Sequence, residues 1–282
     1  MILKERIELF YPQDIGKIDR HEAVQTFNEF KFFLNNGEIR AASPSPKGKN
    51  PTGWTVNDWV KKGILLGFRL GELIDVSPDE HFRFFDISTF PLKKLTLQNR
   101  VRLVPGGSAI RDGSYVAPGV VILPPSYINV GAYVDGDTAI DSQCVIGCCA
   151  QIGRRVRMNA GVHIGGTMES PVDLPVIIED DVFIGGQSVI SDGAIVKQKA
   201  VIAAGVILTG STTVYDIVNE KAYRRSNKTP LIIPEHAVVV PGSRAVDTPY
   251  AKKNHLALST ALIIKYRDPK SDAAAVLEES LR

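Results

Sequence analysis

An apolar residue returns at every sixth position through the middle of this 282-residue chain. A second column, four positions after each apolar residue, holds only small or β-branched residues such as Ser114, Cys144 and Val206. A helix repeats about every 3.6 residues and a lone strand every two, so neither explains this pattern. The apolar column reads Ile110, Val116, Ile122, Ile128, Val134, Ile140, Ile146, Ile152, Met158, Ile164, and then Ile178, Ile184, Ile190, Val196, Ile202, Leu208, Val214.

A six-residue repeat with two inward positions is typical of a parallel β-helix, in which each side of a prism is a short strand followed by a turn. The aliphatic residue points into the core, and the small residue lets the chain round the corner. Pairs that favour turns for backbone reasons stand between the inward positions, among them Asp112-Gly113, Pro118-Gly119 and Asp192-Gly193. The sequence therefore predicts a mainly β protein on a parallel β-helix scaffold.

One insert interrupts the repeat. Ile164 and Ile178 are fourteen positions apart where six would keep the register, so eight residues must loop out of the stack. Loops longer than a scaffold needs are often functional.

The repeat divides the chain into three predicted domains: residues 1–100, mainly helical; residues 101–216, the β-helix with its insert at about 166–177; and residues 217–282, a small α+β cap. A solenoid needs such a cap because its last coil exposes unpaired backbone, and we expect the repeat to end at Val214. The expected helices are His21–Asn35, about Asn57–Phe68 and Ser271–Arg282, and the expected strands are Arg100–Val104, Thr229–Val240 and Leu256–Tyr266, with loop and short strands over Ile74–Leu97.

Composition narrows the functional class. A net charge of +2 and a pI near 8.3 are too mild to indicate nucleic acid or an acidic membrane surface as a partner. No apolar run approaches the length of a membrane span, and the first ten residues, MILKERIELF, carry charges where a signal peptide needs an apolar core. Three cysteines, an odd number, favour a reducing compartment, so we expect a cytoplasmic location.

Six segments of the chain carry a family resemblance: WTVNDWVKKGILLGFRL (54–70), PSYINVGAYVD (125–135), IGCCAQIG (146–153), GVHIGGTMES (161–170), IIEDDVFIG (177–185) and GSTTVYD (210–216). They resemble the tetrahydrodipicolinate N-succinyltransferase family of hexapeptide acyltransferases. The resemblance implies a left-handed β-helix, a homotrimer, and transfer of succinyl from succinyl-CoA to the amine of hydrated, ring-opened tetrahydrodipicolinate in lysine and diaminopimelate biosynthesis. It implies no permanently bound cofactor and no metal, with succinyl-CoA and a small dicarboxylate amine acceptor as partners.

The resemblance places two acids in the active site, Asp141 and Glu169. Acyl transfer from a thioester to nitrogen needs a neutral amine, a group to take its proton and donors for the developing oxyanion. Asp141 follows the inward Ile140, where a short side chain can emerge at a corner. The structural alternatives remain open at this point: Asp141 as one more turn aspartate, and Glu169 as an exposed loop acid.

Other candidate residues follow from the same chemistry. Glycine pairs allow backbone N–H groups to approach a thioester, and a smooth strip of small residues would hold the pantetheine arm. His163 is a rival base that we interpret as lining the site. The substrate-binding candidates are Arg102, Arg69, Asn159, His163, Gly165 and Gly166, and the cofactor-binding candidates are Gly185, Gly186, Ser188, Ala203, Ala204 and Gly205.

Two positions depart from the family pattern. Val189 stands where the family usually has a glutamate, and Gln187 stands where an arginine is common. Related N-acetyltransferases have an apolar residue at the place of Val189. The alternatives are therefore acetyl transfer to the same acceptor or to another amine such as a nucleotide sugar, or a trimeric scaffold that has lost catalysis. A zinc site of three histidines is disfavoured, because only His163 lies inside the repeats.

Overall fold

The computed structural model of the chain describes residues 1–46, 50–168, 170–227 and 229–268. Its N-terminal part holds the helices α1 (Leu3–Phe10), α2 (Arg20–Asn35) and α3 (Asp58–Leu70). The side chain of Asp19 caps α2 by accepting a hydrogen bond of 3.1 Å from the N–H of Glu22. The two helices predicted for this part of the described chain are confirmed, with ends shifted by no more than two residues.

Helices α2 and α3 pack closely because α3 carries glycine where it faces aromatic rings. Phe27 and Phe30 of α2 are buried, and Phe27 meets Phe90 edge-on at 5.3 Å between ring centroids. A Cβ on Gly67 would lie 2.3 Å from the ring of Phe27, and one on Gly63 would lie 2.7 Å from the ring of Phe30. Larger residues at these two positions would force the helices apart.

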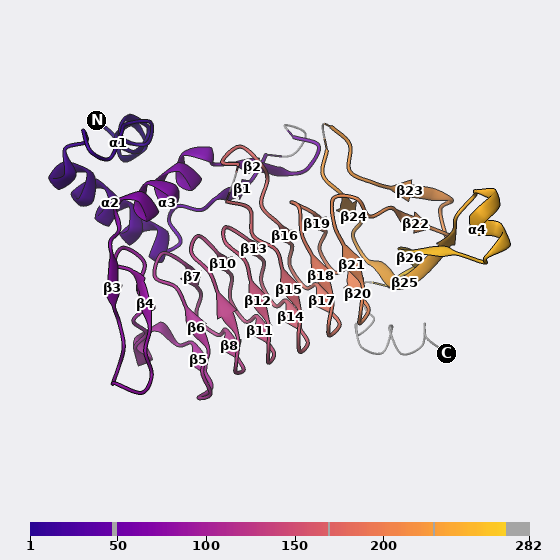
Figure 1. Cartoon of the computed structure of the whole chain (residues 1–282). Coiled ribbons are helices and arrows are strands. Elements are labelled where there is room, and N and C mark those ends of the chain that lie inside the picture. The colour runs from indigo at the N-terminus through magenta and orange to yellow at the C-terminus, as the bar shows by residue number, and fades with distance from the viewer. Residues whose placement is uncertain (47–49, 169, 228, 269–282) are drawn as a thin grey trace.

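The hexapeptide repeat folds into three parallel sheets that form the sides of a prism (Figure 1). Successive strands join the three sheets in turn, so Cα partners such as Ala109 and Tyr127 are eighteen positions apart (127 − 109 = 18). In each two-residue strand the first side chain points outward and the second points into the core. The predicted parallel β-helix is therefore confirmed.

The sheets are named here by their order along the chain. Sheet 1 comprises β6 (Ala109–Ile110), β9 (Tyr127–Ile128), β12 (Val145–Ile146), β15 (His163–Ile164), β18 (Val189–Ile190) and β21 (Ile207–Leu208). Sheet 2 comprises β7 (Tyr115–Val116), β10 (Tyr133–Val134), β13 (Gln151–Ile152), β16 (Ile177–Ile178), β19 (Ile195–Val196) and β24 (Ile232–Ile233). Sheet 3 comprises β5 (Arg102–Leu103), β8 (Val121–Ile122), β11 (Ala139–Ile140), β14 (Arg157–Met158), β17 (Phe183–Ile184), β20 (Val201–Ile202), β25 (Ala237–Ala245), β26 (Ala257–Tyr266), β22 (Val214–Asp216) and β23 (Lys221–Tyr223).

The core of the prism is built from the two predicted inward columns. Ile140 and Ile146 are at most 1% exposed, and Cys144 of the second column is equally buried. Polar members of the second column are satisfied inside the core, as where the hydroxyl of Thr138 donates to the carbonyl oxygen of Gly153 at 2.9 Å. Burying an aliphatic side chain contributes roughly 1.5–3 kcal/mol, so the stacked columns hold the coil together.

The stack does not end at Val214 as the repeat predicted. After β22 and β23 the chain returns, and β24 and β25 pair with β19 and β20 as one further partial coil. The single strand expected over Thr229–Val240 is therefore wrong, because a turn at His236, with φ of +62°, separates β24 from β25. The inward residues Ile233 and Val239 keep the six-residue spacing, but the 19 positions from Val214 to Ile233 (233 − 214 = 19) break the register of the earlier repeats, which is why the sequence pattern did not reveal this coil.

The last coil is covered by a long antiparallel pair. β26 confirms the strand expected over Leu256–Tyr266 and pairs with β25 across most of their lengths. The short helix α4 (Pro249–Lys253) joins the two strands. The helix expected over Ser271–Arg282 lies outside the described residues.

The outer face of sheet 2 is covered by the segment that joins α2 to α3, which contains β1 (Ala42–Pro44) and β2 (Trp54–Val56). The indole N–H of Trp54 donates to Glu179 at 2.9 Å, and the guanidinium carbon of Arg40 lies 3.8 Å from the ring centroid of Tyr133. A second hairpin, β3 (Leu73–Asp75) with β4 (Phe85–Ile87), and a 3₁₀ turn at Leu97–Asn99 lead into the stack. Strand β5 confirms the strand expected over Arg100–Val104.

Candidate active site

Half of the predicted site residues fall on one corner of the prism, where the chain passes from sheet 3 to sheet 1. This corner, called corner A, consists of residues 141–143, 159–161, 185–187 and 203–205. The register of sheet 3 stacks its coils, because the N–H of Asp141 donates to Met158 O (3.0 Å) and that of Asn159 to Ile184 O (2.9 Å). Asp141, Asn159, Gly185 and Ala203 therefore follow one another in a column.

Asp141 emerges half-buried at corner A. Its Oδ1 accepts a hydrogen bond of 2.7 Å from the N–H of Ser142, which fixes the carboxylate against its own turn. Among the described residues, Oδ2 has no hydrogen-bond donor. One oxygen thus holds the side chain in place and the other is available to an ammonium group.

Gly185 lets neighbouring turns approach closely. A Cβ at this position would lie 2.3 Å from the backbone nitrogen of Ala204, so only glycine fits. Within the described part of the chain, the N–H groups of Gly186 and Ala204 have no hydrogen-bond acceptor. Two stacked donors are therefore free for a carbonyl oxygen that gains negative charge.

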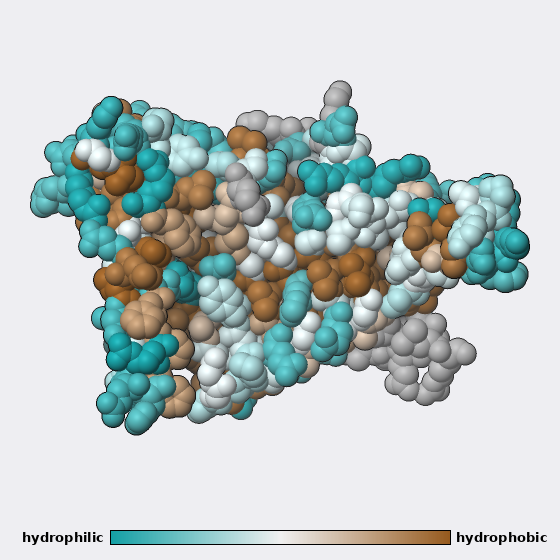
Figure 2. All heavy atoms as spheres, viewed as in Figure 1, coloured by the Kyte–Doolittle hydropathy of each residue, from teal (hydrophilic) through white to brown (hydrophobic). Residues whose placement is uncertain are grey.

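Sheet 1 lies between corner A and the corner that carries the insert. The outward side chains of its middle coils are Val145, His163, Val189 and Ile207, and His163 is directly paired with Val189. His163 and Ile207 are exposed, while Val145 and Val189 are half-buried. Figure 2 shows hydrophobic side chains along this part of the surface. His163 is the titratable side chain of this otherwise apolar stripe.

Corner B lies where the chain passes from sheet 1 to sheet 2 and includes the described part of the insert. It consists of residues 147–149, 165–168, 170–176, 191–193 and 209–211. Gly166 is exposed and Gly165 half-exposed, and both lie against Gly147, where a Cβ would come within 2.2 Å of Gly166 N. Lys61 of α3 is fully buried and donates to the carbonyl oxygens of Ser170 (3.1 Å) and Asp173 (2.6 Å). The N-terminal part thus holds the insert in place.

Comparison with known proteins now identifies the family. Residues 3–70 match the family described as tetrahydrodipicolinate N-succinyltransferase N-terminal, and residues 175–210 match the hexapeptide repeat of succinyl-transferase. The 2,3,4,5-tetrahydropyridine-2,6-dicarboxylate N-succinyltransferase of Nitrobacter hamburgensis is 38% identical over 257 residues, which cover 88% of this chain and 86% of its own. The chain belongs to the tetrahydrodipicolinate N-succinyltransferase family.

Two further relatives carry the same description. The protein from Nitrobacter winogradskyi is 36% identical to this chain over 284 residues. The protein from Acinetobacter baylyi is 38% identical over 254 residues. The first alignment covers 96% of this chain and 94% of the relative, and the second covers 88% and 86%. A solved structure, a putative 2,3,4,5-tetrahydropyridine-2-carboxylate N-succinyltransferase from Campylobacter jejuni, is 14% identical with a TM-score of 0.48, over 85% of this chain and 62% of its own. The hexapeptide match and the three parallel sheets give the fold class, a left-handed parallel β-helix.

Within this family member, two predicted cofactor contacts are turned inward. The side chain of Ser188 is fully buried, and its hydroxyl donates to the carbonyl oxygen of Ala203 at 2.9 Å. Ala203 itself is only 2% exposed. Their side chains cannot meet a ligand on the surface, because both belong to the core; Ala204 and Gly205 beside them are exposed.

The predicted acceptor arginines are not brought together. Arg69 of α3 donates to the carbonyl oxygens of Tyr11 and Gln13, so its guanidinium holds the chain after α1 and does not reach either corner. Arg102 is exposed at the start of sheet 3, two strands before the one that leads to Asp141. Glu169, the second predicted acid, lies outside the described residues.

Cys144 and Cys149 are buried packing residues and are not suited to act as nucleophiles. Cys144 is buried, and its burial raises the pKa of the thiol to about 11. Cys149 is fully buried, and burial raises the pKa of its thiol far above the usual range. A thiolate is the nucleophilic form, so neither residue is suited to form an acyl-enzyme. Within the described ranges there is no group of three or more His, Cys, Asp or Glu residues that could hold a metal ion.

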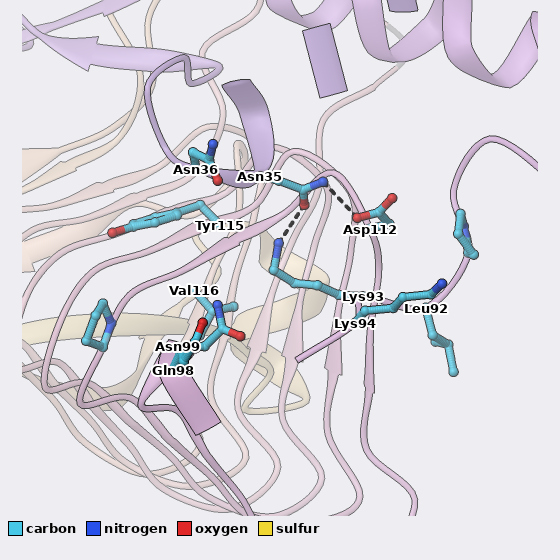
Figure 3. Close-up of a pocket in the computed structure, with 12 residues that line it drawn as sticks. Asn35, Asn36, Leu92, Lys93, Lys94, Gln98, Asn99, Asp112, Tyr115 and Val116 are labelled. Carbon is cyan, nitrogen blue, oxygen red and sulfur yellow. Dashed lines mark hydrogen bonds between the residues drawn. The ribbon is translucent and has the colours of Figure 1, made fainter. Parts of the chain in front are cut away.

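A cavity of about 640 Å³ lies beside the first coil and is distinct from both corners (Figure 3). Lys93 donates to Asn35 Oδ1 (2.5 Å) and Ser114 O (2.9 Å), and Asn35 in turn donates to Asp112 (2.7 Å). Burial lowers the pKa of Lys93 to about 8. Its ammonium group already donates hydrogen bonds to the C-terminal residue of α2 and to the first coil. We therefore interpret this cavity as part of the contact between α2 and the stack, and not as a ligand site.

A smaller cavity of about 430 Å³ opens at corner B. Its lining includes Thr167 and Asp173 of the insert and Arg225 from the segment after the repeat. Sequence reasoning did not single out Thr167 or Arg225. Arg225 has no periodic pattern around it, and only the returning chain brings it to the insert.

None of the helices formed by the described residues is both long enough and apolar enough to cross a membrane.

Proposed function

We propose that this protein transfers the succinyl group of succinyl-CoA to the amine of tetrahydrodipicolinate in its hydrated, ring-opened form. The observation that carries the proposal is the 36 to 38% identity to N-succinyltransferases over 88 to 96% of the chain. The reaction belongs to lysine and diaminopimelate biosynthesis. Succinyl-CoA acts as a co-substrate that enters and leaves with each turnover.

Asp141 is the proposed proton acceptor. Its Oδ2 receives the hydrogen bond of the substrate ammonium and takes one proton, and the freed nitrogen lone pair attacks the thioester carbonyl carbon. The carbon–sulfur bond then breaks, the nitrogen loses its second proton as the amide forms, and that proton goes to the leaving sulfur, so coenzyme A departs as the thiol. No covalent enzyme intermediate is needed, which suits a site whose buried thiols are unreactive.

Corner A also supplies the proposed oxyanion donors. The free N–H groups of Gly186 and Ala204 belong to the same corner as Asp141, two and three coils further along the stack. A carbonyl oxygen placed there would gain hydrogen bonds that strengthen as negative charge develops. We propose the exposed surface at Ala204 and Gly205 as the binding surface of the pantetheine arm.

We further propose a homotrimer whose active sites lie between copies, each with corner A of one copy and the insert of the next. The uncovered apolar stripe on sheet 1 supports this arrangement, because an exposed apolar surface of this kind marks a protein interface. Three identical heterologous contacts close such a ring. Cys144, Cys148 and Cys149 form no disulfide bond within the described residues, which favours a reducing, cytoplasmic location.

An acetyl donor is the second candidate. Val189 and Gln187 favour it, since an apolar residue and a neutral amide give less support to the free carboxylate of a succinyl group.

The test is release of coenzyme A thiol from purified protein with tetrahydrodipicolinate, comparing succinyl-CoA with acetyl-CoA. Faster release with succinyl-CoA is expected. Faster release with acetyl-CoA would move the protein to acetyl transfer, and no release with either donor would overturn both proposals.

A further inference from the structure

The cavity at corner B brings together an arginine and a buried hydroxyl that have no partner. Arg225 is exposed and lines the cavity, and no hydrogen bond or ion pair joins its guanidinium to the rest of the described chain. It lies against Gly210, where a Cβ would stand 3.1 Å from its Nη1. A guanidinium placed beside a cavity in this way is suited to a carboxylate.

Thr167, which also lines this cavity, has a buried Oγ1 with no hydrogen-bond partner among the residues that the structure describes. Leaving a buried hydroxyl unpaired costs about 1–3 kcal/mol, so native proteins rarely do so without a ligand or water to fill the place. A carboxylate in the cavity would accept a hydrogen bond from this hydroxyl and one or two from Arg225.

Two acids in the same cavity restrict which anion can enter. Asp192 Oδ2 accepts from the N–H of Gly210 (2.8 Å) and from the hydroxyl of Ser191 (3.2 Å), which leaves Oδ1 available. Asp173 is exposed, and Lys61 fixes its backbone through the carbonyl oxygen. One cation and two carboxylates repel a phosphate or a plain dicarboxylate, and they fit a group with an ammonium and a carboxylate on the same carbon.

We propose that this cavity binds the amino-acid end of the amine acceptor. Arg225 and Thr167 hold its carboxylate, and Asp192 and Asp173 hold the ammonium until Asp141 of the neighbouring copy takes the proton. The assignment rests on the proposed acyl transfer and adds where the acceptor binds. It also replaces Arg69, whose guanidinium is committed elsewhere.

Arg225→Gln tests the carboxylate contact, and Arg224→Gln is the matched control, because Arg224 is an exposed neighbour that does not line the cavity. Loss of a charged hydrogen bond is expected to raise KM for tetrahydrodipicolinate about 10- to 100-fold. KM for succinyl-CoA should stay within about twofold, and the control should match the wild type. An unchanged acceptor KM in Arg225→Gln would overturn the proposal while leaving the acyl transfer intact.

Binding without turnover separates this inference from the proposed reaction. In calorimetry, 2-aminoadipate, which carries an ammonium beside a carboxylate, should bind the wild type and fail to bind Arg225→Gln. Adipate, which lacks the amine, should bind neither. Equal binding of the two compounds, or equal binding of 2-aminoadipate to both proteins, would reject the cavity as an amino-acid site even if the wild type proved to have no transferase activity.

Discussion

Sheets 1 and 2 are built from the same repeat and differ in what covers them. On sheet 2 the outward residues Gln151, Ile177 and Ile195 are fully buried, largely under the segment between α2 and α3. On sheet 1 the corresponding Ile207 is 52% exposed, and His163 is exposed as well. The described chain covers one side of its prism and leaves bare the side that lies between corners A and B.

This difference indicates which face is functional. The outward residues of sheet 1 are as apolar as those of sheet 2, although the described chain leaves Ile207 exposed and Val145 and Val189 only half-buried. Apolar side chains in a row are costly to leave in water, so another copy is the natural cover. The catalytic candidates stand at the edges of this bare face, where a neighbouring copy would complete a groove.

The largest expected effect concerns the acid at the edge of the bare face. Asp141→Asn keeps the hydrogen bond from Ser142 but removes the proton acceptor, so turnover should fall by about 10²- to 10⁴-fold. Steady-state release of coenzyme A thiol measures this. Asp137→Asn is the matched control, because Asp137 is a turn aspartate of the same repeat with φ of +60°, a conformation that asparagine tolerates. Near-normal turnover of Asp141→Asn would remove the residue from the mechanism.

The second prediction sharpens the contrast between the two sheets. Ile195→Asp buries a charge beneath the α2–α3 segment and should lower the free energy of unfolding by about 3–5 kcal/mol. Val145→Asp, at an outward position of sheet 1, should change that free energy by less than about 1 kcal/mol in the single chain but dissociate the assembly. Urea unfolding and sedimentation measure the two effects. Equal destabilisation of folding by both changes would contradict the contrast.

The third prediction concerns Lys61, through which helix α3 holds the insert at corner B. Lys61→Met keeps the side-chain length but leaves the carbonyl oxygens of Ser170 and Asp173 without their donor, at about 1–3 kcal/mol each. The insert should be cleaved faster by protease, and KM for the acceptor should rise more than kcat falls. Lys62→Met provides the control, since Lys62 pairs with Asp58 on the helix surface. Rescue by Lys61→Arg would support positioning over a purely structural role.

The smallest expected effect lies at the joint between α2 and the first coil. Burial lowers the pKa of Lys93 from 10.5 to about 8, so between pH 8 and 10.5 the unfolded chain binds more protons than the folded one. The free energy of unfolding of the wild type should therefore rise through that window relative to Lys93→Met, by an amount on the order of 2 kcal/mol. Chemical denaturation at pH 7.5 and 10 measures the difference. A constant difference would mean that Lys93 keeps its ordinary pKa.

The stack was predictable because its information is local and repeated. Each inward residue, such as Ile140 or Thr138, obeys the same steric rule in every coil, and the register fixes which turns become neighbours. The position of Asp141 at a corner followed directly from its place after Ile140. The end of the repeat was missed because an excursion through β22 and β23 separates Val214 from β24 and β25, so the register of the earlier repeats does not carry over to these two strands.

The walls of the site were harder to predict, since they depend on contacts across long sequence separations. Arg225 meets the insert only after the chain has left the stack and returned, and Lys61 reaches it from a helix about a hundred residues earlier. Ser188 was predicted as a cofactor contact because it lies close to the pair Gly185-Gly186 in the sequence. Its place in the inward column, which was also visible in the sequence, correctly indicates that its side chain is buried. Periodicity places side chains on a face, and tertiary packing decides which of them meet.

The central claim is that the bare face of sheet 1 is completed by a neighbouring copy and works only then. Mass and turnover should therefore be measured on the same sample across a dilution series. The account predicts a particle of about 92 kDa, three times the 30.8 kDa chain, whose activity per chain falls as it dissociates. A 30.8 kDa monomer with undiminished activity per chain would contradict it.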